Sequence, residues 1–439
     1  MRITLLLIFL ISAIGLQDVD AQEERTLTVE ECVRIGTENS RTLAISEAET
    51  HRAESKSSEA LTYLLPSLSA EASYMRLSDE KPFEIDVPQL PQKIIISPTI
   101  RDQRYLALKV QQPIFTGFKL LSAYKAAKDN AAAEIAQFRS DSLDLSLEIQ
   151  TAYWNLYKAI QLRETVDDNI RLVEAHLSDA QNFLDQGLVT KNEMLEVQAH
   201  LSQVRLGKID AENAVRLSRL NLNKLMGISL DTEISPVSEL AGPSGDKTDL
   251  EQIASEAMDH RAILDAAEKR KSAARNGITA SRSGWLPSVF LAGSYKYARP
   301  NSRILPPEDA WEDSWELGIV MSFDIWNWGR TISRTNQAKA QYRQAELAER
   351  ELRDAIMMQV TAAYLEVDRA TQRVEVAADG VAQSEEFYRI SRSQFEEDVA
   401  TGTDLLDAET ALLQAQTSYI SALADYAIAS AGLNRAIGR

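Results

Sequence analysis

The sequence predicts a mainly α-helical, secreted chain that consists of two tandem copies of one unit and supplies four strands to a transmembrane β-barrel shared among several chains. Three observations support this fold class: an internal repeat, two windows of about seventy residues without strong helix breakers, and short segments in which apolar and polar residues alternate. The repeat fixes the organisation of the chain, because a fold assigned without it would be wrong.

The repeat is visible in "LLPSLSAEASY" (residues 64–74) and "WLPSVFLAGSY" (residues 285–295), which lie 221 residues apart. Farther along the chain the offset is 211, where "QPIFTGFK" (residues 112–119) matches "FDIWNWGR" (residues 323–330). The offset changes only between the two alternating segments of each copy, so the loop there is ten residues longer in the first copy. Insertions are tolerated in surface loops, and we expect this loop to lie outside the packed body.

A secretory signal is expected at residues 1–21. Its apolar run, residues 3–16, is shorter than the ~20 residues of a membrane-spanning helix, and Ala21 supplies a small residue for cleavage. The mature chain is expected to begin near Gln22. Cys32 is the only cysteine and does not follow the apolar run directly, which argues against a lipid anchor, an intrachain disulfide and a Cys-rich metal site.

After the signal, the repeat divides the chain into three segments. These are a first repeat at residues 22–233, a linker rich in Pro, Gly and Ser at residues 234–249, and a second repeat at residues 250–439. Each repeat is expected to contain a helix, a pair of strands and a long helical hairpin.

The two long windows predict helices of ~100 Å. No proline lies between Pro113 and Pro236 or after Pro307. Alternate steps of three and four residues from Ala131 to Leu184 meet apolar residues at nearly every position. Such a 3.5-residue repeat keeps one seam facing a partner when helices supercoil, which indicates the walls of a coiled coil or helical barrel.

Each long helix is expected to end at a turn from which a second helix runs back. Thr190 with Glu193, and Thr401 with Asp404, have the spacing of a helix-starting capping box. Each copy therefore contributes one antiparallel helical hairpin.

The alternating segments predict the strands. In "SLSAEASYMR" (residues 67–76) and "YLALKVQQ" (residues 105–112), apolar and small residues share one face and polar residues the other, and residues 315–323 show the same period of two. This pattern is typical of transmembrane strands, although a soluble antiparallel sheet would show it too. Four strands cannot close a pore, and open edges cannot face lipid, so a transmembrane sheet requires several chains in one barrel.

Composition and motifs favour no enzyme. A net charge of −18 argues against nucleic acid as a partner and is explained most simply by solubility. The segment "GPSGDKT" (residues 242–248) differs from a phosphate loop because Asp246 stands where glycine must precede lysine. The four histidines have no paired ligand spacing and are expected on helix surfaces. No cofactor, metal or catalytic site is predicted.

The chain resembles the TolC family of outer-membrane efflux proteins. The resemblance covers the mature chain and depends on the order and repetition of motifs: "LPSLSAEASY" and "LPSVFLAGSY", "PIFTGFK" and "DIWNWGR", "TAYWNL" and "AAYLEV", and the ends "LNKLMG" and "LNRAIG". It implies a homotrimer with a twelve-stranded barrel in outer-membrane lipid and a twelve-helix tunnel in the periplasm. It also implies an exit duct for an efflux pump or a type I secretion system, joined to a periplasmic adaptor and an inner-membrane transporter.

The resemblance further implies a periplasmic gate on the second-copy tip. Asp404 and Asp407 stand at the family's acidic-ring positions, Phe395 where the family often has a gating tyrosine, and Ala400 where a member has an arginine. Repeated by symmetry, the two acids would favour cations at the constriction. A simpler explanation of Asp404 is its favourable interaction with the helix dipole.

The resemblance assigns adaptor contacts to both tips, for which an ordinary tight turn is the alternative. The residues concerned are Gly187, Leu188, Val189, Thr190, Val399, Ala400 and Thr401.

Two other functions fit the pattern less well: a secreted coiled-coil scaffold with a small soluble sheet, and a general porin. The sequence does not identify the exported substrate.

Overall fold

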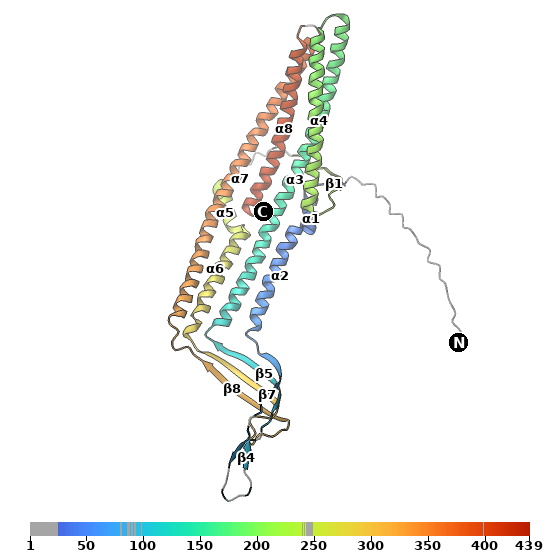
Figure 1. The fold of residues 1–439 in the computed structure, drawn as a ribbon. Coiled ribbons are helices and arrows are strands. Elements are labelled where there is room, and N and C mark those ends of the chain that lie inside the picture. The colour runs from blue at the N-terminus through green and yellow to red at the C-terminus, as the bar shows by residue number, and fades with distance from the viewer. Residues whose placement is uncertain are drawn as a thin grey trace, which may run out of the picture. The chain divides into compact units, whose positions relative to one another are not determined.

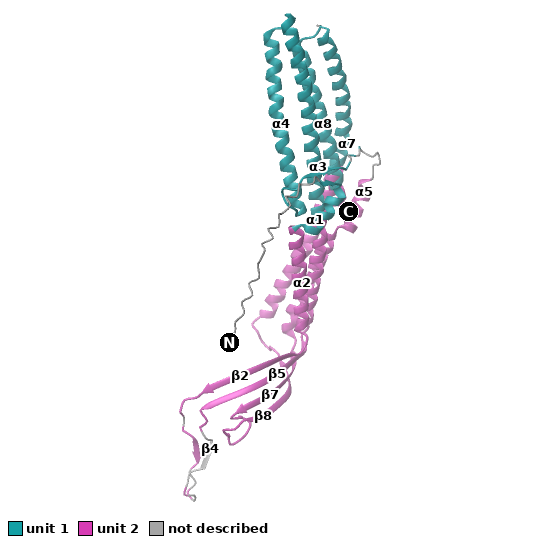
Figure 2. Ribbon diagram, turned by 90° about the vertical axis from the view of Figure 1, so that its right-hand side faces the viewer, with its two compact units in different colours: residues 1–40, 145–245, 366–431 teal, residues 41–144, 246–365, 432–439 magenta. Residues whose placement is uncertain are grey.

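The computed structural model describes residues 25–439 except residues 80, 86, 87, 89, 90, 92, 93, 98, 239, 241, 243–248 and 398. The expected signal peptide and residues 243–248 lie outside the described residues. The chain divides into two compact units, each of which takes segments from both repeats (Figure 2). Unit 1 comprises residues 1–40, 145–245 and 366–431, and unit 2 comprises residues 41–144, 246–365 and 432–439.

Long helices dominate the structure (Figure 1). The helices are α1 (Val29–Asn39), α2 (Arg41–Thr62), α3 (Lys119–Gln186), α4 (Lys191–Met226), α5 (Leu250–His260), α6 (Ala262–Ser281), the 3₁₀ helix η1 (Arg282–Trp285), α7 (Arg330–Glu396) and α8 (Gly402–Ile437). The hairpins α3–α4 and α7–α8 have matching lengths, 68 and 36 residues against 67 and 36, which confirms the predicted duplicated hairpin. Among the described residues, no helix combines the length and apolarity needed to cross a bilayer.

Among the described residues, the strands form three sheets. They are β1 (Arg25–Leu27), β2 (Ser67–Arg76), β3 (Phe83–Ile85), β4 (Ile94–Ser97), β5 (Asp102–Thr116), β6 (Ile234–Pro236), β7 (Ser288–Arg299) and β8 (Glu312–Ser322). The main sheet is antiparallel with the order β2-β5-β7-β8, β3 pairs with β4, and β1 pairs with β6 in parallel. The β3–β4 pair lies in the longer first-copy loop and is drawn beyond the end of the main sheet (Figure 1), as expected of an insertion outside the packed body.

In unit 1, the main helices pack through an apolar seam. The core cluster of α3, α4 and α8 consists of Val173, Ala180, Val197, Leu201, Val204 and Leu406. Val173 and Ala180 are positions of the predicted 3.5-residue repeat, and both are buried. The packing face predicted between Ala131 and Leu184 is thus confirmed at these two positions. In unit 2, α7 likewise buries Ile356 and Val360, which lie one turn apart.

Tyr153 on α3 fixes the small parallel sheet of unit 1. Its side chain is fully buried, and its hydroxyl donates to the carbonyl of Leu27 at 3.0 Å. The same oxygen accepts from the backbone N–H groups of Val237 and Ser238 at 3.1 and 2.9 Å. Nearby Cys32 is also buried, and desolvation raises the pKa of its thiol to about 12, which makes it an unreactive core residue.

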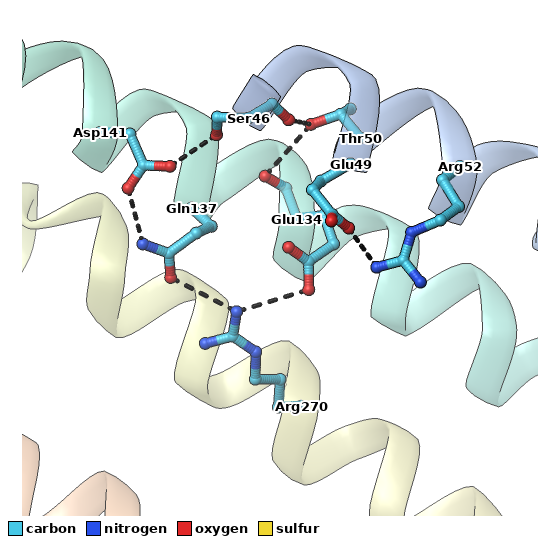
Figure 3. A network of polar contacts seen from close by, with 8 residues as sticks. All are labelled: Ser46, Glu49, Thr50, Arg52, Glu134, Gln137, Asp141 and Arg270. Atoms are coloured by element: carbon cyan, nitrogen blue, oxygen red, sulfur yellow. Dashed lines mark hydrogen bonds and ion pairs between the residues drawn. The ribbon is translucent and has the colours of Figure 1, made fainter. Parts of the chain in front are cut away.

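In unit 2, polar contacts supplement the apolar core between α2, α3 and α6 (Figure 3). Arg270 of α6 donates to Glu134 and Gln137 of α3, at 3.5 and 3.3 Å. Gln137 donates to Asp141, which also accepts from Ser46 of α2 at 2.5 Å. The network joins the three helices and helps to fix their register.

Candidate functional site

One face of the main sheet is apolar but is not covered within the chain. A single row of paired residues crosses all four strands: Ala70, Leu108, Tyr295 and Trp315. The flanking rows on this face contribute further exposed apolar side chains, namely Leu68, Leu106, Val110, Leu291, Leu317, Ile319 and Met321. The alternation predicted from the sequence is thus confirmed, because the pairing register places the apolar residues of every strand on one side.

The opposite face of the sheet is polar and hydrogen-bonded. Glu71 accepts from the ammonium group of Lys109 and from the hydroxyl of Tyr105. The ammonium group of Lys296 lies 4.8 Å from the centre of the Tyr105 ring. Ser294 donates to Glu316 at 3.0 Å. Such a face is suited to line an aqueous lumen, whereas the apolar face is suited to lipid.

The two outer strands of this sheet each have a free edge. Within the described residues, β2 pairs only with β5 and β8 pairs only with β7. Because no other strand of the described chain pairs with these edges, of ten and eleven residues, they can pair with another strand.

Exposed tryptophans follow the apolar face where β8 leads into α7. The rings of Trp326 and Trp328 meet edge to face at 5.9 Å, and Trp328 is 88% exposed. Trp328 and Gly329 both have positive φ, 53° and 77°, as do Gly117 and Phe118 at the equivalent turn of the first copy, 61° and 66°. Both copies therefore turn from strand to helix through two left-handed residues, one of which is aromatic. Exposed aromatic rings of this kind are typical of a membrane interface.

The first tip joins α3 to α4 through a tight turn. Gly187 has a φ of 76°, which favours glycine, while Leu188 is exposed and Val189 partly exposed. The amide of Glu193 donates to the hydroxyl of Thr190, and the carboxylate of Glu193 accepts from the amide of Thr190 at 3.1 Å. This pair of bonds confirms the capping box predicted from the sequence.

The second tip begins α8 with the same arrangement. One oxygen of Asp404 accepts from both the amide and the hydroxyl of Thr401, at 2.9 and 2.7 Å. The bond from the Thr401 hydroxyl, followed by the bond from the Thr401 amide, holds the pKa of the Asp404 carboxyl below its usual range. Asp407 lies one turn farther along and is exposed, like Asp404. Val399 is exposed and Ala400 partly exposed. The two acids therefore share an uncovered face of the helix.

Phe395, the third predicted gate residue, is buried within the chain. Its ring meets the rings of His176 and Phe183 edge to face, at 5.0 and 5.5 Å. Phe395 therefore ties the end of α7 to α3, and its side chain is buried whereas those of Asp404 and Asp407 are exposed.

The structure overturns one expectation about the histidines. His176 is not on a helix surface: it is 3% exposed, and its Nδ1 lies 3.4 Å from Oε2 of Glu409, which is 1% exposed. The sequence contains a signal that could have identified it, because His176 lies three residues after Val173 and four before Ala180, on the same buried face of α3. The described residues contain no group of three or more His, Cys, Asp or Glu side chains placed to hold a metal ion.

The model of a family described as outer membrane efflux protein matches residues 36–228 and 253–439. The outer membrane efflux protein BepC of Brucella suis biovar 1 is 22% identical over 334 residues, covering 76% of this chain and 72% of that protein. The outer membrane protein TolC of Vibrio cholerae serotype O1 is 23% identical over 384 residues, covering 85% and 82%.

Solved structures share the fold at lower sequence identity. The CmeC outer membrane channel of Campylobacter jejuni superposes with a TM-score of 0.79 at 15% identity, covering 93% of this chain and 85% of that chain. The outer membrane protein VceC of Vibrio cholerae gives a TM-score of 0.77 at 19% identity, covering 93% and 96%.

Proposed function

Because this chain belongs to the outer membrane efflux protein family, we propose that it is the exit duct of a tripartite efflux pump or a type I secretion system. The protein is an outer-membrane efflux channel with its helical part in the periplasm, and it is not an enzyme. The proposed duct takes substrate passively from a periplasmic adaptor and an inner-membrane transporter. A wall of helices has little chemical selectivity, so the substrate is chosen by the transporter.

The observation that carries the proposal is the amphipathic sheet with two free edges. In a bilayer every backbone polar group needs a partner, and β2 and β8 each lack one on their outer side. Pairing β8 of one copy with β2 of the next satisfies both edges and repeats the same contact around an axis. The apolar face then lies against outer-membrane lipid, and the face with Glu71 and Lys109 lines the lumen. The family resemblance sets the number of copies at three.

The helices of unit 1 favour the same assembly. In unit 1, α3 is paired with α4 through Asp167 and Lys208 and with α8 through Lys158 and Asp425, and Asp425 also pairs with Arg373 of α7. These pairs place α3 and α8 between α4 and α7. The two outer helices carry large apolar side chains that the chain leaves exposed: Leu195, Leu206, Ile209 and Leu217 on α4, and Val376, Phe387 and Ile390 on α7. Contact between α4 of one copy and α7 of the next would bury both sets.

The second tip is the proposed periplasmic gate. Three copies of Asp404 and Asp407 place six carboxylates around the axis, which favours cations and opposes anions. The pKa of Asp404 is lowered by its bonds to Thr401, so this carboxylate stays charged at neutral pH. Phe395 supports the gate from behind, through its contacts with α3.

Adaptor contact is proposed for the outermost residues of the two tips. Leu188 and Val399 are apolar and exposed at equivalent positions of the two copies, beside Gly187, Val189, Thr190, Ala400 and Thr401. In a trimer, Leu188 and Val399 would form a ring of six exposed apolar side chains, and the adaptor would contact this ring.

Membrane fractionation with a matched pair of variants tests the proposal. The wild-type chain is expected in outer membranes as an oligomer that dissociates on heating. Ile319 and Val320 are neighbours on β8 that point to opposite faces and are 74% and 53% exposed. Ile319→Lys places a charge in lipid, at a cost of about 2–4 kcal/mol for each chain, and should prevent assembly. Val320→Lys places it in the lumen and should assemble normally.

A soluble, detergent-independent wild-type species would contradict the duct and favour the coiled-coil scaffold. Equal effects of the two lysine variants would contradict the assigned faces. Large constitutive conductance of the wild type would favour a general porin.

A further inference from the structure

The buried pair of His176 and Glu409 connects two helices that come from different repeats. His176 lies on α3 and Glu409 on α8, 233 residues apart in sequence, and both belong to unit 1. Among the residues that the structure describes, Glu409 is the only charged side chain at hydrogen-bond distance from His176. Removing one member of such a buried pair is strongly destabilising, because the other member is then left buried without a partner.

The second ring nitrogen of His176 has no partner. Nε2 is completely buried and makes no hydrogen bond, while Nδ1 faces Glu409. A neutral imidazole with its proton on Nδ1 suits this arrangement, since Nδ1–H can donate to the carboxylate and Nε2 then carries only a lone pair. A proton on Nε2 would create a buried donor without an acceptor, which is costly.

The unpartnered nitrogen faces the start of α8. A Cβ built on Gly402, the first residue of α8, would lie 3.7 Å from Nε2 of His176 and 3.8 Å from Cε2 of Phe395. Gly402 and Glu409 are seven residues apart and share one side of the helix. The imidazole ring therefore spans the first two turns of α8, the segment that carries Asp404 and Asp407. The N-terminal end of a helix also disfavours a positive charge.

We propose that His176 and Glu409 are positioning residues for the gate: they hold the first turns of α8 against α3 while the imidazole is neutral, and protonation of Nε2 favours the open tip. The inference rests on the proposed duct. In the closed tip the imidazolium would keep its Nδ1–H bond to Glu409, but its buried Nε2–H would lack an acceptor, whereas opening exposes Nε2 to water. A proton that binds the open state better shifts the equilibrium toward it. Mild acid is therefore expected to open the channel.

Other charged groups on the surrounding helices are held by partners of their own. Asp404 is bonded to Thr401, Glu196 of α4 accepts from Thr403 at 3.4 Å, and Arg392 of α7 is paired with Glu396. Glu174 of α3 is paired with Arg205 of α4, and Tyr388 of α7 accepts from Arg392. These helices also carry Asp179 on α3, His200 on α4 and Asp407 on α8. His200 also has a buried, unpartnered Nε2, which makes it the necessary comparison.

Channel recordings with the purified full-length trimer in planar bilayers test the role of the pair. Between pH 7.5 and pH 5.5, where histidine changes charge, the wild-type mean conductance is expected to rise about fivefold. His176→Gln keeps a polar group of similar size that does not titrate, and its conductance should change by less than about twofold over this range. His200→Gln, and His51→Gln at an exposed site of unit 2, should keep the wild-type response.

The outcomes separate the two claims. A complete lack of channel activity at every pH would refute the proposed duct. Channels whose acid response persists in His176→Gln, or disappears in His200→Gln instead, would refute only the role of the pair.

Hydrogen exchange in the wild-type trimer covers the case in which His176→Gln fails to assemble. After correction for intrinsic rates, peptides spanning residues 402–412 should lose protection at pH 5.5 relative to pH 7.5, while peptides of the sheet should not. Equal protection at the two pH values would overturn the proposal.

Discussion

The two helical hairpins have nearly the same lengths and equivalent capping boxes, but they differ in the side chains at one helix-packing position. In one contact, His176 of α3 meets Glu409 of α8, and both are buried. With the repeat offset of 211, the equivalent residues are Phe387 of α7 and Gln198 of α4, and both are exposed within the chain. The first contact is internal. In the proposed trimer the second would lie between neighbouring copies, so equivalent positions of the two repeats would serve an internal polar pair in one hairpin and assembly in the other.

The largest expected effect comes from placing a charge at the proposed contact between α7 of one copy and α4 of the next, called the outer contact below. Phe387 is 47% exposed in the single chain and would be covered by α4 of the next copy. Phe387→Glu should remove about 2 kcal/mol at each of three seams and weaken trimerisation roughly 10⁴-fold. The trimer band in unheated gels is expected to disappear. Phe387→Leu, which keeps an apolar side chain, is the control, and a normal trimer in Phe387→Glu would place this residue outside the seam.

A substitution in the His176–Glu409 pair, which lies within one chain, should lower the free energy of unfolding and leave trimer assembly unchanged. Glu409→Ala leaves His176 buried without its partner and is expected to cost about 3 kcal/mol for each chain. The equivalent change at the exposed position, Gln198→Ala, should stay within about 0.5 kcal/mol. Denaturant midpoints of the two purified variants measure the difference. Equal denaturant midpoints for Glu409→Ala and Gln198→Ala would contradict the stabilising role assigned to the buried His176–Glu409 pair.

The acidic residues of the two tips can be compared in the same way, by their effect on channel conductance. Neutralising Asp404 and Asp407 together, as Asp404→Asn and Asp407→Asn, removes six charges from the proposed constriction and should raise single-channel conductance about fivefold. The equivalent first-copy change, Glu193→Gln with Glu196→Gln, should raise it less than about twofold. If the second-copy double variant conducts like the wild type, the acidic gate is assigned wrongly.

Much of this fold was predictable because its signals are local. The absence of proline from the long windows, the spacing from Ala131 to Leu184, and the strand alternation each follow from the period of one element, and the structure confirms them. The capping boxes at Thr190 and Thr401 were predictable for the same reason, since a box is defined within four residues. The division into units was not, because each unit combines segments from both repeats.

The buried polar pair was not predictable because its two members are 233 residues apart. A lone histidine on a long helix is usually exposed, and only the packing of α8 against α3 brings Glu409 to it. Phe395 shows the same limit: its place in the motif order predicts a gate residue, but its burial against Phe183 depends on tertiary contacts. The gate assignment of Asp404, Asp407 and Phe395 remains a proposal that concerns several chains.

The smallest expected effect separates the two capping boxes by pH. Thr401→Ala and Thr190→Ala each remove an N-cap hydroxyl and should weaken local protection of the following helix by about 1 kcal/mol at pH 7. At the second tip the hydroxyl also donates to Asp404 and lowers the pKa of that carboxyl, whereas Glu193 accepts from the amide of Thr190. A lowered folded-state pKa adds stability above the unfolded value of about 3.9, and this stability is lost as the pH falls through the folded value. The difference between wild type and Thr401→Ala should therefore shrink below about pH 3.9, as measured by hydrogen exchange of residues 402–410. A constant difference from pH 7 to pH 3 would show that the bond from the hydroxyl to Asp404 contributes nothing to the tip.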